Sequence, residues 1–229
     1  MNTSGKLIVI EGTDGSGKAT QTKLLQEYLL SKNQKVEVFD FPRYETFFGD
    51  FVGRYLRGEL GDPTQLSPLW KSLPYALDRF GVRDEMKDAL SSGKTVLCNR
   101  YTISNMAHQS TGYKFLEERE VFWDWLKELE YVQLGLPRED LVIFLHVPSK
   151  IAQDLTRQKG DRAYLKGKKQ DVHEEDLDYL TKVELRYLEL CQIEKHWRKM
   201  HCVDENNDLL PIKSIHQLIL DTLKSEYGI

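Results

Sequence analysis

A short apolar segment of the chain leads directly into a glycine-rich loop that ends in a lysine. Residues 6–10 have the length and composition of a buried strand, and residues 19–31 have the apolar spacing of a helix. Between them the sequence reads Gly12-Thr13-Asp14-Gly15-Ser16-Gly17-Lys18. This order predicts a phosphate-binding loop, because small residues let backbone amides surround phosphate oxygens and a lysine can reach the terminal phosphates.

The loop and the first turn of the helix form the predicted phosphate site, in which Lys18 is also a predicted catalytic residue. Its members are Gly12, Thr13, Asp14, Gly15, Ser16, Gly17, Lys18, Ala19 and Thr20. Ala19 departs from the usual pattern, because Ser or Thr commonly follows the lysine and binds magnesium. Thr20 does not replace it, since the next residue on a helix points about 100° away. We therefore expect magnesium to be held through water or by another carboxylate, with Glu11 and Asp14 as candidates.

The rest of the chain has the pattern of an α/β protein. Further apolar segments and helical segments alternate, the former at 35–41, 95–98, 141–147 and 200–203, the latter at 46–60, 67–90, 117–134 and 212–225. The helix at 67–90 is expected to kink at Pro74, which lacks a backbone amide hydrogen. Strands that are apolar on both faces predict a doubly wound parallel five-stranded sheet with helices on both faces. No linker or repeat divides the sequence, so we expect a single domain over residues 1–229.

Composition and charge exclude several classes of protein. Lys and Arg total 32 and Asp and Glu total 36, and this net charge of −4 is unfavourable for a nucleic-acid coat. The three cysteines, at 98, 191 and 202, have no metal-ligand spacing and fit a reduced protein. The sequence has neither a secretory signal nor an apolar run of roughly 18 residues that could span a membrane. We expect a cytoplasmic protein without membrane or nucleic-acid partners.

Polar motifs follow the predicted strands, at the sheet edge where α/β proteins bind ligands. Phe41-Pro42-Arg43-Tyr44 follows the second strand and Asn99-Arg100-Tyr101 follows the third, before Ser104-Asn105-Met106-Ala107-His108. The segment at 67–90 carries Tyr75-Ala76-Leu77-Asp78-Arg79, and Gly135-Leu136-Pro137-Arg138-Glu139-Asp140 precedes the fourth strand. Asp14 is unusual, because a carboxylate beside a polyphosphate is unfavourable unless it holds a hydroxyl group.

Together these motifs resemble those of the thymidylate kinase family, in matching order from Leu7 to about Tyr187. The resemblance implies a P-loop kinase fold and transfer of the γ-phosphoryl group of ATP to dTMP, with magnesium as cofactor. It also implies a homodimer, for which the helices at 46–60 and 67–90 could supply an apolar surface.

The same resemblance assigns roles to the acceptor residues. Asp14 would hold the 3′-hydroxyl of dTMP, and Arg43 and Arg100 would bind its phosphate, with Arg100 also counted as catalytic. The remaining predicted dTMP ligands are Tyr75, which would stack on thymine, Arg79 and Asn105, which would read the base, Ser104, and His108 at the 2′ side of the sugar. Taken alone, several of these residues have simpler interpretations, as a core aromatic, a solvated arginine, a helix cap or a packed histidine.

A basic segment at 157–171 has little apolar periodicity, and by itself it would be a solvated loop. In the thymidylate kinase family, a mobile lid at this place closes over ATP and supplies an arginine when the phosphate loop has none. Residues 13–16 are not basic, so Arg157 and Arg162 are the predicted catalytic lid residues.

Asn99 is a second departure, because the family motif usually begins with an aspartate that helps to organise magnesium. Ala19 and Asn99 keep open the alternative of a nucleotide-binding protein with weakened catalysis. Another nucleoside monophosphate kinase or a deoxynucleoside kinase is the nearest rival. Asn99-Arg100-Tyr101 and Arg43 favour a monophosphate acceptor, since nucleoside kinases usually carry a Glu-Arg-Ser type of motif.

Overall fold

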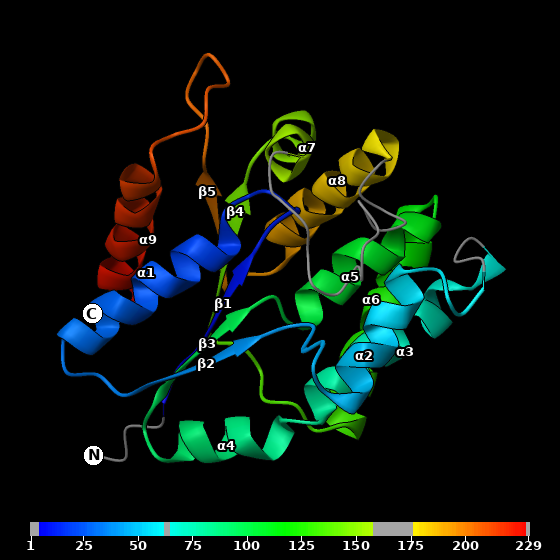
Figure 1. Cartoon of the computed structure of the whole chain (residues 1–229), viewed down its shortest axis with the longest axis horizontal. Helices are drawn as coiled ribbons and strands as arrows, with labels where there is room; N and C mark the ends of the chain where they lie inside the picture. The colour runs from blue at the N-terminus through cyan, green and yellow to red at the C-terminus, as the bar shows by residue number, and fades with distance from the viewer. Residues whose placement is uncertain (1–4, 62–64, 158–175, 228–229) are drawn as a thin grey trace.

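The computed structural model describes residues 5–61, 65–157 and 176–227, and within them the strands form one parallel sheet (Figure 1). Its order is β2-β3-β1-β4-β5. The strands are β1 (Leu7–Glu11), β2 (Val36–Asp40), β3 (Thr95–Asn99), β4 (Leu141–His146) and β5 (Trp197–His201). The all-parallel pairing confirms the predicted doubly wound sheet.

Helices cover both faces of this sheet, because its strands are apolar on both sides. They are α1 (Lys18–Ser31), α2 (Phe47–Leu56), α3 (Pro68–Phe80), α4 (Arg83–Ser91), α5 (Thr102–Gln109), α6 (Leu116–Lys127), α7 (Ser149–Arg157), α8 (Leu177–Ile193) and α9 (Ile212–Tyr227). Alternate residues of β1 point to opposite faces of the sheet. Leu7 and Val9 pack in a cluster with α4, α5, α6 and α8, whereas Ile8 and Ile10 pack with α1 and α9.

The strand order places the loop after β1 at a crevice. β1 lies between β3 and β4, so the strands that follow β1 in sequence lie first on one side of it, as β2 and β3, and then on the other side, as β4 and β5. Ligands of open α/β sheets bind outside the carboxyl ends of the strands at such a switch point. The residues after β1 and β3 meet here, and the backbone amide of Arg100 donates to the carbonyl oxygen of Ile10 at 3.0 Å.

The prediction of one helix over residues 67–90 is wrong, because the structure has two helices there. α3 runs through Pro74 and ends at Phe80, and the chain then turns at Gly81 and Val82 before α4 begins. A Cβ atom on Gly81 would lie 2.9 Å from Nη2 of Arg43. The helix therefore breaks at Gly81, a residue with a low helix propensity, and not at Pro74.

Other boundaries also differ from the sequence prediction. The predicted helix at 117–134 is α6 followed by a π-helical turn, Glu128–Gln133, and the last strand begins at Trp197 and not at 200. Three helices were not predicted from periodicity, namely α5, α7 and α8. In the part of the chain that the structure describes, no helix is both long and apolar enough to cross a membrane.

Candidate active site

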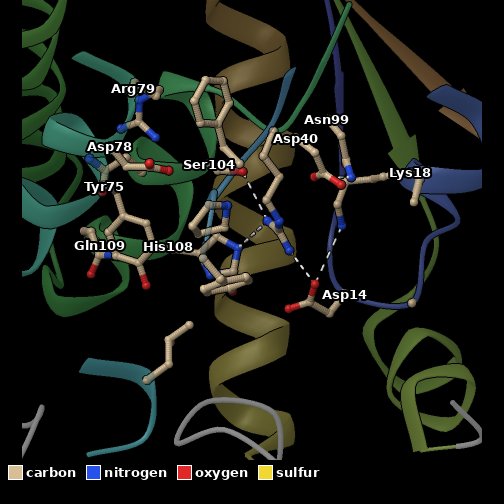
Figure 2. A pocket seen from close by; sticks show the side chains of 18 of the residues that line it. Asp14, Lys18, Asp40, Tyr75, Asp78, Arg79, Asn99, Ser104, His108 and Gln109 are labelled. Carbon is tan, nitrogen blue, oxygen red and sulfur yellow. Dashed lines mark hydrogen bonds and ion pairs between the residues drawn. The ribbon is translucent and has the colours of Figure 1, made fainter. Parts of the chain in front are cut away.

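A pocket of about 380 Å³ opens at the carboxyl edge of the sheet, between the phosphate loop and helices α3 and α5 (Figure 2). Most of the predicted site residues line it. They are Asp14, Gly15, Gly17, Lys18, Ala19, Tyr75, Arg79, Arg100, Ser104, Asn105 and His108. The structure therefore gathers into one pocket residues from segments that lie far apart in the sequence.

The glycines of the phosphate loop adopt conformations that other residues rarely take. Gly15 and Gly17 have φ angles of 88° and 89°, and a Cβ on Gly15 would lie 2.1 Å from the carbonyl oxygen of Ala152. α1 begins without a side-chain cap on its first amides, and Thr13 Oγ1 and Ser16 Oγ are buried without a hydrogen-bond partner among the described residues. These donors, at a helix N-terminus, suit a phosphate group.

Lys18 is almost completely buried and its ammonium group is held inside the loop. Nζ donates to the carbonyl oxygens of Gly12 at 3.0 Å and Thr13 at 2.9 Å, and lies 3.7 Å from Asp14 Oδ1. The charge is thus positioned beside the loop amides. Thr20 is exposed and is not among the residues that line the pocket, as expected from its direction on the helix.

Arg100 joins several polar side chains of the pocket. Its backbone has a φ of 66°, which is unusual for a residue with a side chain and is typical of functional sites. Its guanidinium forms an ion pair with Asp14, donates to Ser104 Oγ at 3.1 Å and contacts His108 Nε2 at 3.3 Å. Burial opposes the charge, but the Asp14 carboxylate, with Tyr187 and Glu11, leaves the pKa of Arg100 raised well above its usual value.

Glu11, a predicted metal candidate, is fully buried and occupied by protein donors. Its carboxylate accepts from the Tyr101 amide at 2.8 Å, from Ser104 Oγ at 2.7 Å and from the Tyr187 hydroxyl at 2.8 Å. Glu11 is not among the lining residues of the pocket. This placement argues against Glu11 as a metal ligand and gives it the role of fixing the start of α5, including Ser104.

Asp40, at the end of β2, brings a carboxylate to the pocket that sequence analysis missed. It is paired in register with Asn99 on β3, and Asn99 Nδ2 donates to Asp40 Oδ1 at 2.8 Å. Burial raises the pKa of Asp40, and this effect is opposed by Arg100, the Asn99 hydrogen bond and Lys18. The sequence could have indicated Asp40, because it lies near the end of the second predicted strand and the carboxyl ends of neighbouring parallel strands meet at one edge.

Arg43, predicted to bind the acceptor phosphate, is held at the margin of the site. Its Nη2 donates to the Asp78 carbonyl at 2.7 Å, its Nε lies 3.2 Å from Asp78 Oδ1, and its backbone amide donates to Asp78 Oδ2 at 2.8 Å. Asp78 lines the pocket but Arg43 does not. The buried Asp78 therefore fixes the loop after β2 against α3.

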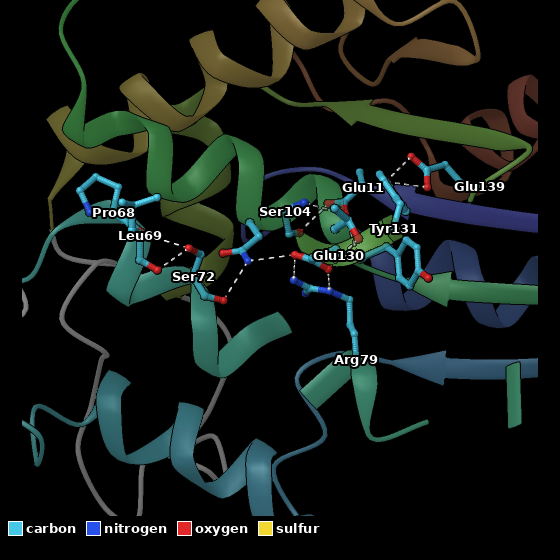
Figure 3. A network of polar contacts seen from close by, with 12 residues as sticks. Glu11, Pro68, Leu69, Ser72, Arg79, Ser104, Glu130, Tyr131 and Glu139 are labelled. Carbon is cyan, nitrogen blue, oxygen red and sulfur yellow. Dashed lines mark hydrogen bonds and ion pairs between the residues drawn. The ribbon is translucent and has the colours of Figure 1, made fainter. Parts of the chain in front are cut away.

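The end of the pocket farthest from the phosphate loop carries the predicted base readers. Tyr75 lies edge-on to Tyr55, with ring centroids 6.3 Å apart. Arg79 forms two hydrogen bonds of 2.6 Å with Glu130, and Asn105 donates to the Ser72 carbonyl at 3.0 Å (Figure 3). Burial opposes the charge of Arg79, but Glu130 raises the pKa of Arg79 above its usual value, so the guanidinium stays charged.

His108 lies between these two ends of the pocket. One ring nitrogen contacts Arg100 and the other lies 3.1 Å from the Tyr179 hydroxyl, which comes from α8. Arg157, a predicted lid residue, is the exposed last residue of α7, and Arg162 lies outside the described residues. The structure thus joins His108 to the site and does not place Arg157 in it.

Comparison with known proteins shows the family of this chain. A family model described as thymidylate kinase matches residues 10–219. The chain is 34% identical over 190 residues to thymidylate kinase from Schizosaccharomyces pombe, covering 77% of this chain and 83% of that protein. The chain belongs to the thymidylate kinase family. It is also 34% identical over 162 residues to thymidylate kinase from Plasmodium falciparum, covering 71% of this chain and 70% of the relative.

A solved thymidylate kinase from Candida albicans has the same fold as this family member. The two structures superpose with a TM-score of 0.73 over 97% of this chain and 92% of the other, at 22% sequence identity. Membership identifies a nucleoside monophosphate kinase, which is a phosphotransferase, and such kinases generally use ATP with a divalent metal.

Sequence analysis did not single out several residues that shape this site. Besides Asp40, Asp78 and Tyr179 line the pocket, and the buried Glu130, which is not a lining residue, binds Arg79. Glu130 had no sequence signal, because it is one acidic residue in a polar segment 51 positions from its arginine partner.

Proposed function

We propose that this chain transfers the γ-phosphoryl group of ATP to dTMP, forming dTDP and ADP. One observation carries the proposal. A single pocket joins a phosphate loop to an arginine–carboxylate pair, Arg100 and Asp14, and ends in an aromatic and polar wall that contains Tyr75 and Asn105. Such a pocket has room for a nucleoside monophosphate, whose phosphate would face the loop and whose base would reach the wall.

In this proposal catalysis depends on position and charge. The loop amides and Lys18 would hold the β- and γ-phosphates of ATP, and Arg100 would hold the acceptor phosphate in line with them. Asp14 would accept a hydrogen bond from the 3′-hydroxyl of dTMP. Ser104 and His108 contact the Arg100 guanidinium and would keep it aligned while charge moves onto the transferred group.

We propose magnesium as the divalent metal. Magnesium prefers oxygen ligands and is usually held by one or two carboxylates together with substrate phosphates. The carboxylates of Asp14 and Asp40 both line the pocket that Lys18 lines, so these residues fit an ion that arrives with ATP. The described residues contain no group of three or more His, Cys, Asp or Glu side chains that could hold a metal ion. When bound, magnesium would neutralise charge on the β- and γ-phosphates.

The remaining proposals concern the lid and the assembly. We propose residues 157–171 as a basic lid, with Arg157 and Arg162 as its catalytic residues, because the phosphate loop itself contains no arginine. We also propose a homodimer through α2 and α3, whose Phe47 and Trp70 are 85% and 66% exposed. All three cysteines are free, which fits a cytoplasmic location.

The proposed reaction is tested by incubating the purified chain with ATP, magnesium and dTMP and by separating the nucleotides. The proposal predicts equal amounts of dTDP and ADP, both dependent on dTMP. Binding of both nucleotides without turnover would instead favour the nucleotide-binding alternative that Ala19 and Asn99 keep open.

A further inference from the structure

Glu130 is a buried carboxylate that the proposed phosphoryl transfer does not use. It is 0% exposed and lies in the π-helical turn after α6. It accepts two hydrogen bonds of 2.6 Å from Arg79, one of 2.8 Å from Thr102 Oγ1 and one of 3.2 Å from Asn105 Nδ2 (Figure 3). Burying a charge is unfavourable unless it is paired and hydrogen-bonded, and π-helical turns are common at functional sites.

The contacts of Glu130 fix the orientation of the Asn105 amide. Asn105 Nδ2 has two hydrogens to donate, and both have acceptors, Glu130 Oε1 and the Ser72 carbonyl oxygen. A flipped amide would place Oδ1 against these two oxygens. Oδ1 therefore stays on the other side, where it is buried and has no hydrogen-bond partner among the described residues. A donor group of a ligand in the pocket could satisfy this acceptor.

Glu130 also limits which nitrogens of the Arg79 guanidinium can donate to a ligand. The carboxylate binds Nε and Nη2 of the guanidinium, so Nη1 is the nitrogen that it leaves for other partners. Both Arg79 and Asn105 line the pocket. The two side chains can thus offer one acceptor, Asn105 Oδ1, and one donor, Arg79 Nη1.

This pattern is complementary to one class of pyrimidine. A keto pyrimidine has an N3–H donor beside a carbonyl acceptor, whereas an amino pyrimidine has an N3 acceptor beside an amino donor. We propose that Glu130 is a positioning residue for base recognition, which holds Arg79 and Asn105 so that the pocket accepts keto pyrimidines and rejects amino pyrimidines. This inference rests on the proposed function and adds to it the residue that sets the base preference.

The test is Glu130→Gln, which keeps the size of the side chain but replaces one acceptor oxygen with a donor. The substituted amide can no longer accept from Arg79, Thr102 and Asn105 together, so the Asn105 amide is free to turn. We expect the ratio of the association constant for dTMP to that for dCMP, measured by calorimetry, to fall by about tenfold or more. The wild-type preference arises because a mispaired base leaves polar groups unsatisfied. The KM for ATP should not change. Glu128→Gln, an exposed residue of the same turn, is the matched control and should keep the wild-type ratio.

A wild-type ratio in folded Glu130→Gln protein would overturn the role of Glu130 and leave the proposed function standing. Equal binding of dTMP and dCMP by the wild type would overturn the inferred base preference, while transfer of phosphate to dTMP would still be tested separately by product formation. Solvent exchange of side-chain amide protons, measured by NMR on the wild type, does not depend on the variant folding. The inference predicts slow exchange for Asn105 relative to the exposed Asn206, and equal rates would contradict it.

Discussion

Asn99 Nδ2 donates a 2.8 Å hydrogen bond to Asp40 Oδ1, between residues that are paired in register on β3 and β2. The family motif usually has a carboxylate at the position of Asn99. In this chain the neighbouring strand supplies one, at the same edge of the sheet and in the same pocket as Lys18. Asp40 therefore supplies a carboxylate at this edge, and the amide of Asn99 holds it in place.

This pair makes the effect of Asn99→Asp specific. The substitution replaces a hydrogen bond with two carboxylates in contact, which raises the pKa of one of them. We expect a lower melting temperature at neutral pH in the absence of metal, partly restored by magnesium, and a stronger dependence of turnover on magnesium. Melting curves with and without magnesium measure this. A variant as stable as the wild type, with no response to magnesium, would show that the two side chains do not interact.

Asp40→Asn tests the raised pKa of Asp40 through the pH dependence of stability. The folded protein holds the Asp40 proton more tightly than the unfolded chain, whose reference pKa is 3.8. The contribution of Asp40 to the free energy of unfolding should therefore fall as the pH rises from that reference through the raised folded value. Urea denaturation across this range should show a shallower fall for Asp40→Asn. Parallel curves for the two proteins would mean that the pKa of Asp40 is not raised.

Lys18→Ala tests the phosphate loop. The substitution removes a buried charge that would contact the transferred phosphoryl group, so we expect a loss of about 3 kcal/mol or more in transition-state stabilisation. Steady-state kinetics give the value, and circular dichroism checks the fold. Lys23→Ala, on the exposed side of α1, is the control. Normal turnover of Lys18→Ala would exclude the loop from catalysis.

Arg157→Ala and Arg162→Ala test the proposed basic lid. An arginine that acts mainly in the transition state should, when removed, lower kcat and leave the KM for dTMP nearly unchanged. Lys150→Ala, on the exposed surface at the start of α7, should have no effect. If both arginine variants and their double variant keep full turnover, another residue must supply the positive charge that stabilises the transferred phosphoryl group.

The sequence predicted those parts of the structure whose determinants are local. The phosphate loop is continuous in sequence, and the apolar strands predicted the parallel sheet, so Lys18 and Arg100 were both placed correctly at its carboxyl edge. The break after α3 was missed, because a single glycine such as Gly81 is often tolerated inside a helical pattern.

The polar support of the site was harder to predict. Arg79 binds Glu130 across 51 positions in the sequence, and the contact of the Asp40 carboxylate with Asn99 follows only from the register of the two strands. Neither residue departs from an ordinary polar pattern in the sequence. Their importance comes from burial and from partners that only the folded chain brings together.

Whether the chain is a kinase of dTMP is decided by kcat/KM over a panel of acceptors. A coupled ADP-release assay with ATP and magnesium would compare dTMP, dUMP, dCMP, dAMP, dGMP, AMP and GMP. We expect the value for dTMP to exceed that for dCMP and each purine nucleotide, because each mispaired polar group costs roughly 1–3 kcal/mol in the wrong complex. AMP or GMP as the best acceptor, or no ADP release with any of them, would contradict the proposed function.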